Sequence, residues 1–366
     1  MEAARQVLAE GLSQLEAHIH GLELRDVALA RSAPDEPVEF QRYREHILQR
    51  STSELSLEYC AAVVFLYGLW ERFVESVLAA YVSALNSVVD EFAHLPQELR
   101  AQHTNLSAEL LLARHHQKYA GVVEEASLVR NLNSCMRGES DYKLNTLAFA
   151  QHSQNLRIDV VTEMFARVGL PALSAQVRQS RPLSGLLEER GHVALASLSD
   201  GVAFHEINDL AARRNEVAHG ETSSLLSREF MRDYARYVGI VGQTIVGVLR
   251  QQLLRVDADQ NGIKMPSPIA VYNRSIVCFA SVGVDVRVGD RIVGISGRRR
   301  YHASEIQSIE VDHERRSMID KSSSEAFAAL VQFPAKLNWE YRLIPAAEDC
   351  TQPEEAGGAT PIERRV

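Results

Sequence analysis

The residues best suited to chemistry lie in the stretch RRNEVAHG, residues 213–220. Arg214 and His219 stand five positions apart, and Asn215 follows the arginine directly. A guanidinium can hold a phosphate through paired hydrogen bonds, and a histidine can give or take a proton near neutral pH. These residue types therefore suit the binding or cleavage of a phosphate-bearing substrate.

The same stretch ends a helix that the apolar spacing predicts over 201–219, with Asp200 as N-cap and a glycine just past the end. On a helical wheel, Arg214 lies near the centre of an apolar arc formed by Phe204, Ile207, Leu210, Ala211, Val217 and Ala218. A buried guanidinium without a partner is costly. Either Arg214 forms an internal ion pair with Glu71 or Glu75, or it lines a cleft or subunit seam and holds a phosphate.

The position of His219 adds a geometric problem. Asn215 and His219 are four residues apart, so they share a helix face and can hydrogen-bond. Arg214 and His219 point about 140° apart and differ by about 7.5 Å in height on an ideal helix, so they do not converge easily. Either Gly220 lets the helix end turn the histidine away, or a two-fold seam brings two arginines and two histidines to one pocket.

The elements that must position this site are helical up to about residue 255, because prolines are few and apolar residues recur every three or four positions. Besides the helix over 201–219, this pattern predicts helices over 54–88, over 156–168 with Asn155 as N-cap, and over 225–255 with Ser223 or Ser224 as N-cap.

The residue composition and the apolar pattern change after these helices. The polar, glycine- and proline-containing segment 257–268 is predicted to be a linker. Short β-branched runs broken by glycine turns then predict a small barrel or curled sheet over 269–345. The polar tail 346–366 is expected to be disordered. The expected fold is therefore mainly α: a helical domain over 1–256 followed by a small β-rich domain.

Composition narrows the function further. The net charge of −9 over 366 residues argues against a basic coat that would hold long nucleic acid without specificity. The four cysteines are far apart in sequence and form no CxxC pair. The most apolar run, 59–70, is too short to span a bilayer, and the N-terminus has no apolar signal core. We therefore expect a cytoplasmic protein with no membrane partner.

The stretch RRNEVAHG resembles the signature of the HEPN superfamily, an arginine and a polar residue that precede a histidine at a helix end in an all-α bundle. Two further stretches, LYGLWERFVESVLAAY at 66–81 and HSQNLRIDVVTEMFARVGLP at 152–171, are similar to segments of bacterial stand-alone HEPN-like nucleases of the RiboL-PSP type. The resemblance covers about 50–255 and leaves the β-rich segment unassigned.

The resemblance implies a homodimeric endoribonuclease that uses no metal ion and no other cofactor. The RNA 2′-hydroxyl would attack the adjacent phosphate and leave a 2′,3′-cyclic phosphate and a 5′-hydroxyl. His219 would act as general base or acid, Arg214 would stabilise the transition state, and Asn215 would orient the histidine or bind a phosphate oxygen. The implied substrate is tRNA, rRNA or mRNA, and the implied role is a toxin or phage-defence effector with an antitoxin or a trigger ligand.

Several other residues are candidates for supporting roles. Glu71 either positions Arg214 or is a partly exposed helix residue. Arg213 lies on the polar flank of its helix, where we expect a solvated side chain that can also touch RNA backbone. His152 is expected to have a capping or surface role.

A run of arginines marks the β-rich segment. Arg298, Arg299 and Arg300 concentrate at a predicted hairpin tip, where they could contact RNA phosphates. The alternative is a solvated turn whose field is offset by nearby acidic residues, namely Asp285, Asp290, Glu305 and Glu310.

Two alternatives to a nuclease stay open. The same pocket could hold a nucleotide or polyphosphate without catalysis, with the β-rich domain docking a partner. The helical domain could also be a structural dimerisation scaffold in which Arg214 pairs with Glu71. The sequence contains no GxxxxGK[ST], GxSxG or HExxH motif, so ATPase, α/β-hydrolase and zinc protease functions have no support.

Overall fold

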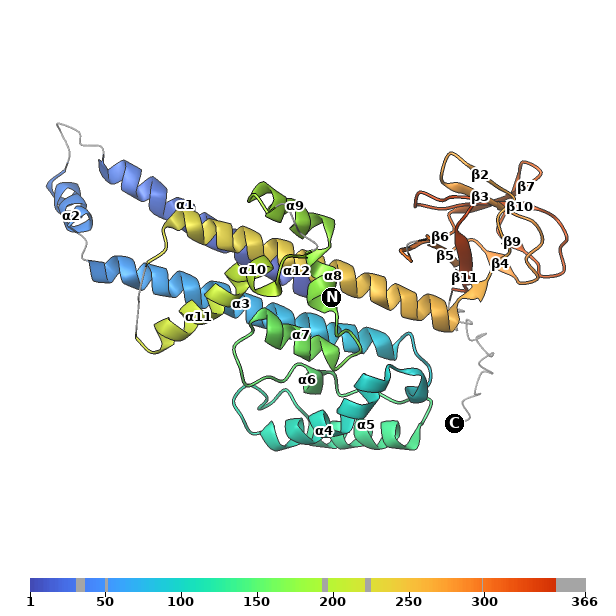
Figure 1. The fold of residues 1–366 in the computed structure, drawn as a ribbon, viewed down its shortest axis with the longest axis horizontal. Coiled ribbons are helices and arrows are strands. Elements are labelled where there is room, and N and C mark those ends of the chain that lie inside the picture. The colour runs from blue at the N-terminus through green and yellow to red at the C-terminus, as the bar shows by residue number, and fades with distance from the viewer. Residues whose placement is uncertain (31–36, 50–51, 193–196, 221–224, 298, 347–366) are drawn as a thin grey trace, which may run out of the picture. The chain divides into compact units, whose positions relative to one another are not determined.

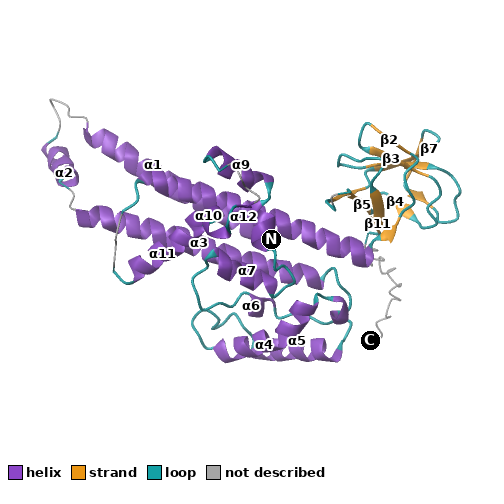
Figure 2. Cartoon of the chain, in the orientation of Figure 1, coloured by secondary structure: helices purple, strands orange, loops and turns teal. Residues whose placement is uncertain are grey.

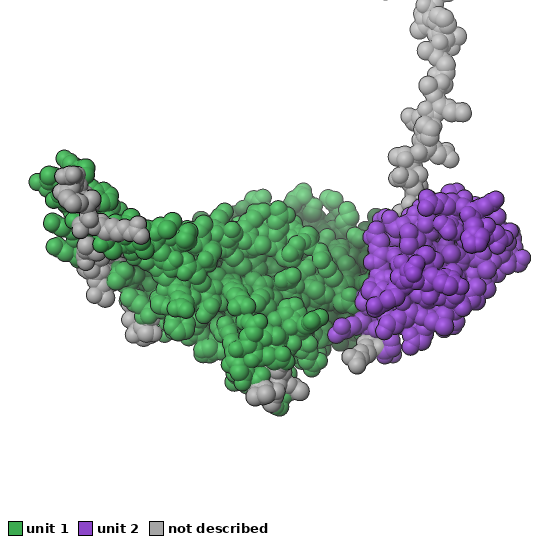
Figure 3. Space-filling view, turned by 90° about the horizontal axis from the view of Figure 1, so that it is seen from above, with its two compact units in different colours: residues 1–256 green, residues 257–366 purple. Residues whose placement is uncertain are grey.

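The chain forms two compact units, Met1–Val256 and Asp257–Val366, which are coloured separately in Figure 3. The computed structural model describes residues 1–30, 37–49, 52–192, 197–220, 225–297 and 299–346. Within these ranges the first unit is built from helices and the second mainly from strands (Figure 2). This confirms the predicted mainly α fold with a small β-rich segment after the helices.

The helices vary widely in length, and three of them are much longer than the rest. Their bounds are α1 Glu2–Ala30, α2 Val38–Leu48, α3 Thr52–Asn86, η1 Phe92–His94, α4 Gln97–Ala113, α5 Glu125–Arg137, α6 Thr146–Phe149, α7 Ile158–Ala166, α8 Leu173–Arg178, α9 Arg181–Glu189, α10 Asp200–Ala203, α11 His205–Ala218 and α12 Arg228–Asn261. Among the described residues, none of these helices combines the length and the apolar character that a membrane crossing requires.

The long helices α1, α3 and α12 run side by side and form the centre of the first unit (Figure 1). Their close approach depends on Gly242 of α12, where an added Cβ would lie 2.5 Å from Leu8 of α1 and 3.4 Å from Phe73 of α3. On α3, Trp70 is fully buried and donates its indole N–H to the carbonyl of Leu156 at 2.9 Å. Hydrophobic burial along α3 therefore fixes the helix on which the candidate site is built.

The helix predicted over 54–88 corresponds to α3, whereas the predicted start of α7 was wrong. Asn155 does not cap α7, which begins at Ile158 with Arg157 at the N-cap position. The side-chain oxygen of Asn208 on α11 instead accepts the backbone N–H of Ile158 at 3.0 Å. The cap of α7 is thus supplied by another helix, and α7 and α11 are held together.

The predicted helix over 201–219 is two helices. Phe204, with φ −117° and ψ 30°, separates α10 from α11, and Ser199 rather than Asp200 stands at the N-cap position of α10. The physical reason is burial, because Phe204 is fully inside the core and the chain bends to place it there. Ser223 and Ser224, expected to cap the last helix, lie outside the described residues.

The last helix, α12, begins at Arg228 and continues through Asn261, well into the segment 257–268 that the sequence suggested as a linker. Strand β1 begins only two residues later, at Ile263. Apart from Ala346, the polar tail lies outside the described residues.

The second unit consists of short antiparallel strands around their own core. The strands are β1 Ile263–Lys264, β2 Ala270–Tyr272, β3 Ile276–Phe279, β4 Val286–Arg287, β5 Arg291–Ile295, β6 Tyr301–Glu305, β7 Ser308–Val311, β8 Glu314–Arg316, β9 Met318–Ile319, β10 Phe327–Leu330 and β11 Glu340–Ile344. They form sheets in the orders β1-β11-β5-β6, β2-β3-β10-β7-β8 and β4-β9. Alternating burial along β3 and β10 is typical of strands with one face in a core.

Candidate active site at the end of α11

Helix α11 carries Arg214, Asn215 and His219 at its C-terminal end and packs against α3. Its buried residues are Ile207, Leu210 and Ala211, and this apolar side faces the core. Gly220 follows with φ +74°, a left-handed conformation that favours glycine. The predicted helix end just before Gly220 is therefore present in the structure.

Arg214 is half-buried and lies over the ring of Tyr67 on α3. Its guanidinium carbon is 5.4 Å from the ring centroid, which is the geometry of a cation–π contact. Its Nη1 is also 3.5 Å from Oδ1 of Asn215, which is long for a hydrogen bond. The guanidinium thus has an aromatic face beneath it and keeps donors for another acceptor.

The internal ion pair from Arg214 to Glu71 or Glu75, which the sequence left open and which the scaffold alternative placed at Glu71, is not formed. Within the described ranges, no carboxylate lies at ion-pair distance from the Arg214 guanidinium. Tyr67 is one turn before Glu71 on α3, and it is Tyr67 that stands opposite Arg214. The charge of Arg214 is therefore not cancelled by a direct partner among these residues.

His219 is exposed at the end of α11. Its backbone N–H still donates to the carbonyl of Asn215 at 3.0 Å, so the histidine stays on the helical path. The structure shows this backbone bond between the two residues and, in the part of the chain that it describes, no bond between their side chains. Gly220 consequently does not swing the histidine toward Arg214 within one chain.

Tyr67 connects this site to the polar side of α3. Its hydroxyl accepts the backbone N–H of Leu156 at 2.9 Å, which fixes the ring under Arg214. Burial raises the pKa of the Tyr67 hydroxyl, the neighbouring carboxylate of Glu71 adds to this, and the Leu156 bond and the Arg214 charge oppose it. Sequence reasoning missed Tyr67, although Tyr67, Glu71 and Glu75 repeat every four residues on one helix face.

Glu71, Glu75 and His152 form a cluster next to Tyr67, which we call the carboxylate–histidine cluster. His152 Nε2 is 2.7 Å from Glu75 and 3.8 Å from Glu71, and its Nδ1 is 2.8 Å from the carbonyl of Gln154. The His152 side chain is only 7% exposed, so the expectation of a capping or surface residue was wrong. His152 lies in a loop that is far from α3 in sequence, so residue spacing alone does not predict its contact with Glu71 and Glu75.

The carboxylate–histidine cluster has the donor set for a metal ion, since one ligand atom from each residue lies within 4.8 Å of the others. Lys118 already forms an ion pair with Glu75. Burial would raise the pKa of Glu75, but hydrogen bonds from His152 and Lys118 outweigh it and lower this pKa. The ammonium group of Lys118 thus already compensates the more buried carboxylate.

Arg213 is held inside a separate network, and the expectation of a solvated side chain was wrong. It pairs with Asp209 one turn earlier and donates to the hydroxyl of Tyr59 at 2.9 Å. Asp209 also accepts from the hydroxyl of Tyr234 on α12, at 2.6 Å. Burial would lower the pKa of Arg213, but the bonds with Tyr59 and Asp209 raise it. With 15% of its side chain exposed, Arg213 ties α11 to α3 and α12.

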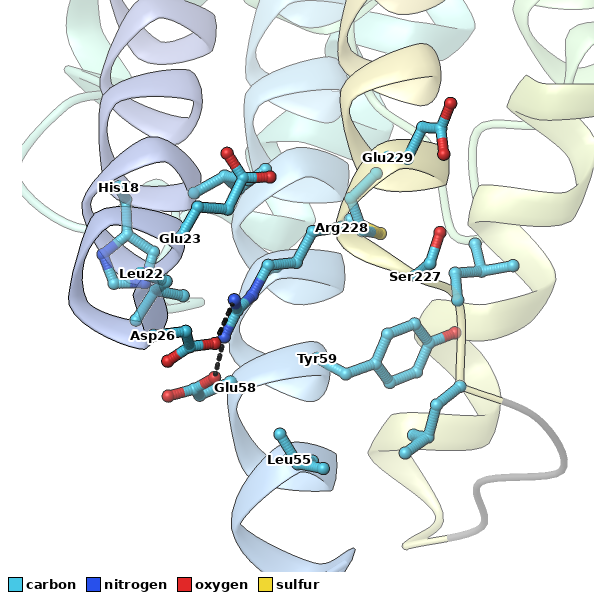
Figure 4. Close-up of a pocket in the computed structure, with 15 residues that line it drawn as sticks. His18, Leu22, Glu23, Asp26, Leu55, Glu58, Tyr59, Ser227, Arg228 and Glu229 are labelled. Carbon is cyan, nitrogen blue, oxygen red and sulfur yellow. Dashed lines mark hydrogen bonds and ion pairs between the residues drawn. The ribbon is translucent and has the colours of Figure 1, made fainter. Parts of the chain in front are cut away.

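A pocket of about 640 Å³ lies beside this network, between α1, α3 and the start of α12 (Figure 4). Arg228 reaches across it and pairs with Asp26 at 2.6 Å and Glu58 at 3.6 Å. Glu23 and Glu229 also line it. The carboxylates outnumber the cation at this rim, so the pocket does not suit a phosphate, and it is distinct from the end of α11.

In the β-rich unit, Arg299 and Arg300 are exposed at the turn between β5 and β6, and Arg298 lies outside the described residues. Three of the four acidic residues expected to offset their charge, Asp285, Asp290 and Glu310, have other partners. Asp290, for example, accepts backbone N–H groups from Arg287 and Ala346.

The bundle and the arginine and histidine at the end of α11 together define a HEPN-type domain. Residues 39–251 match the RiboL-PSP-HEPN family, and the chain belongs to this family. The match contains α11 and most of α12 and does not extend to the strands of the second unit. No curated protein and no solved structure matches the chain.

Proposed function

We propose that the protein is a homodimeric endoribonuclease that cleaves RNA without a metal ion. The observation that carries this proposal is the state of Arg214. It is half-buried on the ring of Tyr67, no carboxylate among the described residues neutralises it, and a histidine stands at the end of the same helix. A fixed, unneutralised guanidinium is suited to an anion that gains charge during a reaction.

The chemistry follows from the side chains. His219 removes the proton from the RNA 2′-hydroxyl or donates a proton to the departing 5′-oxygen. The 2′-oxygen attacks the adjacent phosphorus, the bond from phosphorus to the 5′-oxygen breaks, and the products are a 2′,3′-cyclic phosphate and a 5′-hydroxyl. Arg214 stabilises the charge on the phosphoryl oxygens, and Asn215 binds a phosphate oxygen.

A second copy of the chain solves the geometric problem within one helix. Because His219 keeps its helical hydrogen bond to Asn215, Arg214 and His219 of one protomer diverge. A two-fold arrangement of two α11 ends places the arginine of one protomer near the histidine of the other. The exposure of His219 leaves its ring accessible to such a partner.

The biological role within this proposal is a toxin-like or phage-defence effector that cuts tRNA, rRNA or mRNA. Such an enzyme requires an antitoxin or a trigger ligand that keeps it inactive until it is needed. Glu71 acts in support, because its carboxylate faces the Tyr67 hydroxyl on the ring that carries Arg214.

The test is induced expression in a bacterial host, followed by mapping of 5′-hydroxyl RNA ends. The wild type is compared with His219→Ala and with His205→Ala, a matched control at the exposed opposite end of α11. We expect growth arrest and new 5′-hydroxyl ends with the wild type and His205→Ala, and neither with His219→Ala. Cleavage that persists in His219→Ala would overturn the proposed mechanism.

The same site also fits a non-catalytic phosphate ligand, because Arg214 keeps free donors. If purified protein leaves every RNA class intact, titration with nucleotides and polyphosphate decides between the two functions. Saturable binding that is lost in Arg214→Ala, without RNA cleavage under any condition, would favour the binding function.

A further inference from the structure

Two arginines, Arg299 and Arg300, lie between β5 and β6, and their described backbone is held by bonds with Ser296. Ser296 accepts the backbone N–H of Arg299 at 2.7 Å and donates its own N–H to Arg300 at 2.9 Å. Its hydroxyl oxygen also accepts the N–H of Arg300 at 3.2 Å. Both arginines are exposed, and within the described ranges neither guanidinium has a carboxylate at ion-pair distance.

The acidic residues of this unit do not neutralise these two arginines. Asp285 and Asp290 accept backbone N–H groups elsewhere in the unit. Glu310 lies 3.6 Å from Arg315, and Glu305 stands at the far end of β6. The two guanidinium groups therefore keep their positive charge, although the whole chain carries −9.

A stack of aromatic rings begins two residues after Arg300. His302 on β6 stacks on Trp339 with ring centroids 4.8 Å apart and planes 15° apart. Phe333 continues the stack, 6.3 Å from Trp339 at 17°. Gly294 makes room for it, since an added Cβ would lie 2.8 Å from Phe333 and 3.0 Å from Trp339.

Two of these three rings are partly accessible. Phe333 is buried, whereas His302 and Trp339 are only partly buried. Burial, and secondarily the charge of Arg300, lower the pKa of His302. A neutral imidazole next to an indole offers a stacking surface, and the guanidinium groups beside it offer donors for phosphate.

We infer that Arg299 and Arg300, together with the His302–Trp339 pair, bind single-stranded RNA and select the substrate of the nuclease. Unpaired bases stack on aromatic rings, and arginines at the edge of the stack bind the connecting phosphates. Paired strands present no free base faces, so this surface discriminates against duplex RNA. The inference rests on the proposed ribonuclease function and assigns substrate selection to the unit outside the family match.

The test measures binding by the full chain carrying His219→Ala, so that RNA stays intact. Fluorescence anisotropy is recorded with a labelled single-stranded 12-nucleotide RNA and with its duplex, at several salt concentrations. We expect the double change Arg299→Ala and Arg300→Ala to weaken single-strand binding at least tenfold. We also expect the slope of log affinity against log salt to become shallower by about 1.4, the value for two phosphate contacts on a single strand.

A matched control is Arg315→Ala, which removes one exposed arginine of the same unit, 82% exposed and close to Glu310. It should change the affinity by less than twofold. Trp339→Leu should weaken single-strand binding about tenfold by loss of base stacking. A thermal unfolding curve of each variant shows whether the second unit stays folded. If Trp339→Leu unfolds this unit, the double change Arg299→Ala and Arg300→Ala provides the test.

Unchanged affinity in the arginine pair, an equal loss in Arg315→Ala, or tighter binding of the duplex would overturn the inference. Failure of the proposed nuclease gives a different result. In that case RNA binding depends on Arg299 and Arg300, but no RNA is cut by the protein with His219 intact. Conversely, cleavage that depends on His219 and is indifferent to Arg299 and Arg300 preserves the nuclease and removes the selection surface.

Discussion

The neighbouring arginines Arg213 and Arg214 should respond to alanine substitution in opposite ways. Arg213 is partly buried in a network with Asp209 and Tyr59, whereas Arg214 lies on the ring of Tyr67 without a carboxylate at ion-pair distance in the described part of the chain. Both changes remove one guanidinium from consecutive positions of α11, so each serves as the control for the other. Arg213→Ala should cost stability, and Arg214→Ala should cost activity.

The magnitudes follow from these contacts. Loss of one cation–π contact in Arg214→Ala should lower the free energy of unfolding by about 1 kcal/mol. The 3.5 Å contact with Asn215 is too long to add much. Arg213→Ala leaves the carboxylate of Asp209 without its cation in a partly buried network, and leaving such a charged group with fewer partners costs about 2–3 kcal/mol. Loss of a charge-stabilising donor in Arg214→Ala should reduce the cleavage rate about 100- to 1000-fold.

Urea unfolding followed by the helical circular dichroism signal measures the first quantity, and single-turnover cleavage of an RNA oligonucleotide measures the second. An Arg214→Ala loss as large as that of Arg213→Ala would refute the reasoning. It would mean that Arg214 is paired with a carboxylate in solution and that the end of α11 is a structural brace. Full cleavage by Arg214→Ala would refute the role of the guanidinium in catalysis.

Three further predictions concern the bundle around the site. Burial lowers the pKa of His103 to about 4 from the ordinary 6.5, so the unfolded chain binds this proton first as pH falls. The free energy of unfolding should therefore fall by about 3 kcal/mol in full as the pH is lowered from about 6.5 to 4. Urea unfolding at pH 7 and at pH 4.5 measures this loss, and the loss should be smaller in His103→Gln than in the wild type. Tyr67→Phe should lower the free energy of unfolding by about 1–3 kcal/mol, because the Leu156 N–H loses its acceptor. RNA cleavage should persist in this variant because the ring under Arg214 remains. Tyr67→Leu should lose both this stability and the cleavage of RNA. Chelation with EDTA should leave RNA cleavage unchanged; loss of cleavage that returns with added metal would assign an ion to the carboxylate–histidine cluster.

The sequence was sufficient to place Arg214 and His219 at a helix end, but it did not predict Tyr67, the residue that Arg214 contacts. The apolar spacing and Gly220 predicted the helix end that carries Arg214 and His219, because these signals are local. Which α3 residue lies opposite Arg214 depends on the position of α11 along α3. A shift of one helical turn would place Glu71 there instead of Tyr67. A helical wheel gives the direction of a side chain but not this register.

The other differences have the same origin in long-range contacts. His152 meets Glu75 across 77 positions, and Asn208 caps α7 across 50, so neither contact leaves a signal at fixed spacing. Phe204 interrupts the helix over 201–219 because its burial outweighs local helix propensity. The β-rich segment was predicted from its turns, whereas the stack of His302 and Trp339 required the register of β5 with β6 and β11.

Arg214 is held more firmly than His219, and this difference bears on how the proposed nuclease would be controlled. Arg214 is positioned by its contact with the Tyr67 ring, and a hydrogen bond from the Leu156 N–H holds the Tyr67 hydroxyl in place. His219 is exposed and is placed by backbone bonds at the helix end. In the proposed dimer, the second protomer must therefore orient the histidine, because one chain supplies no contact that does so within the described residues. An inhibitor that keeps the protomers apart would abolish cleavage while leaving the arginine in place, so the monomer would still bind phosphate through Arg214.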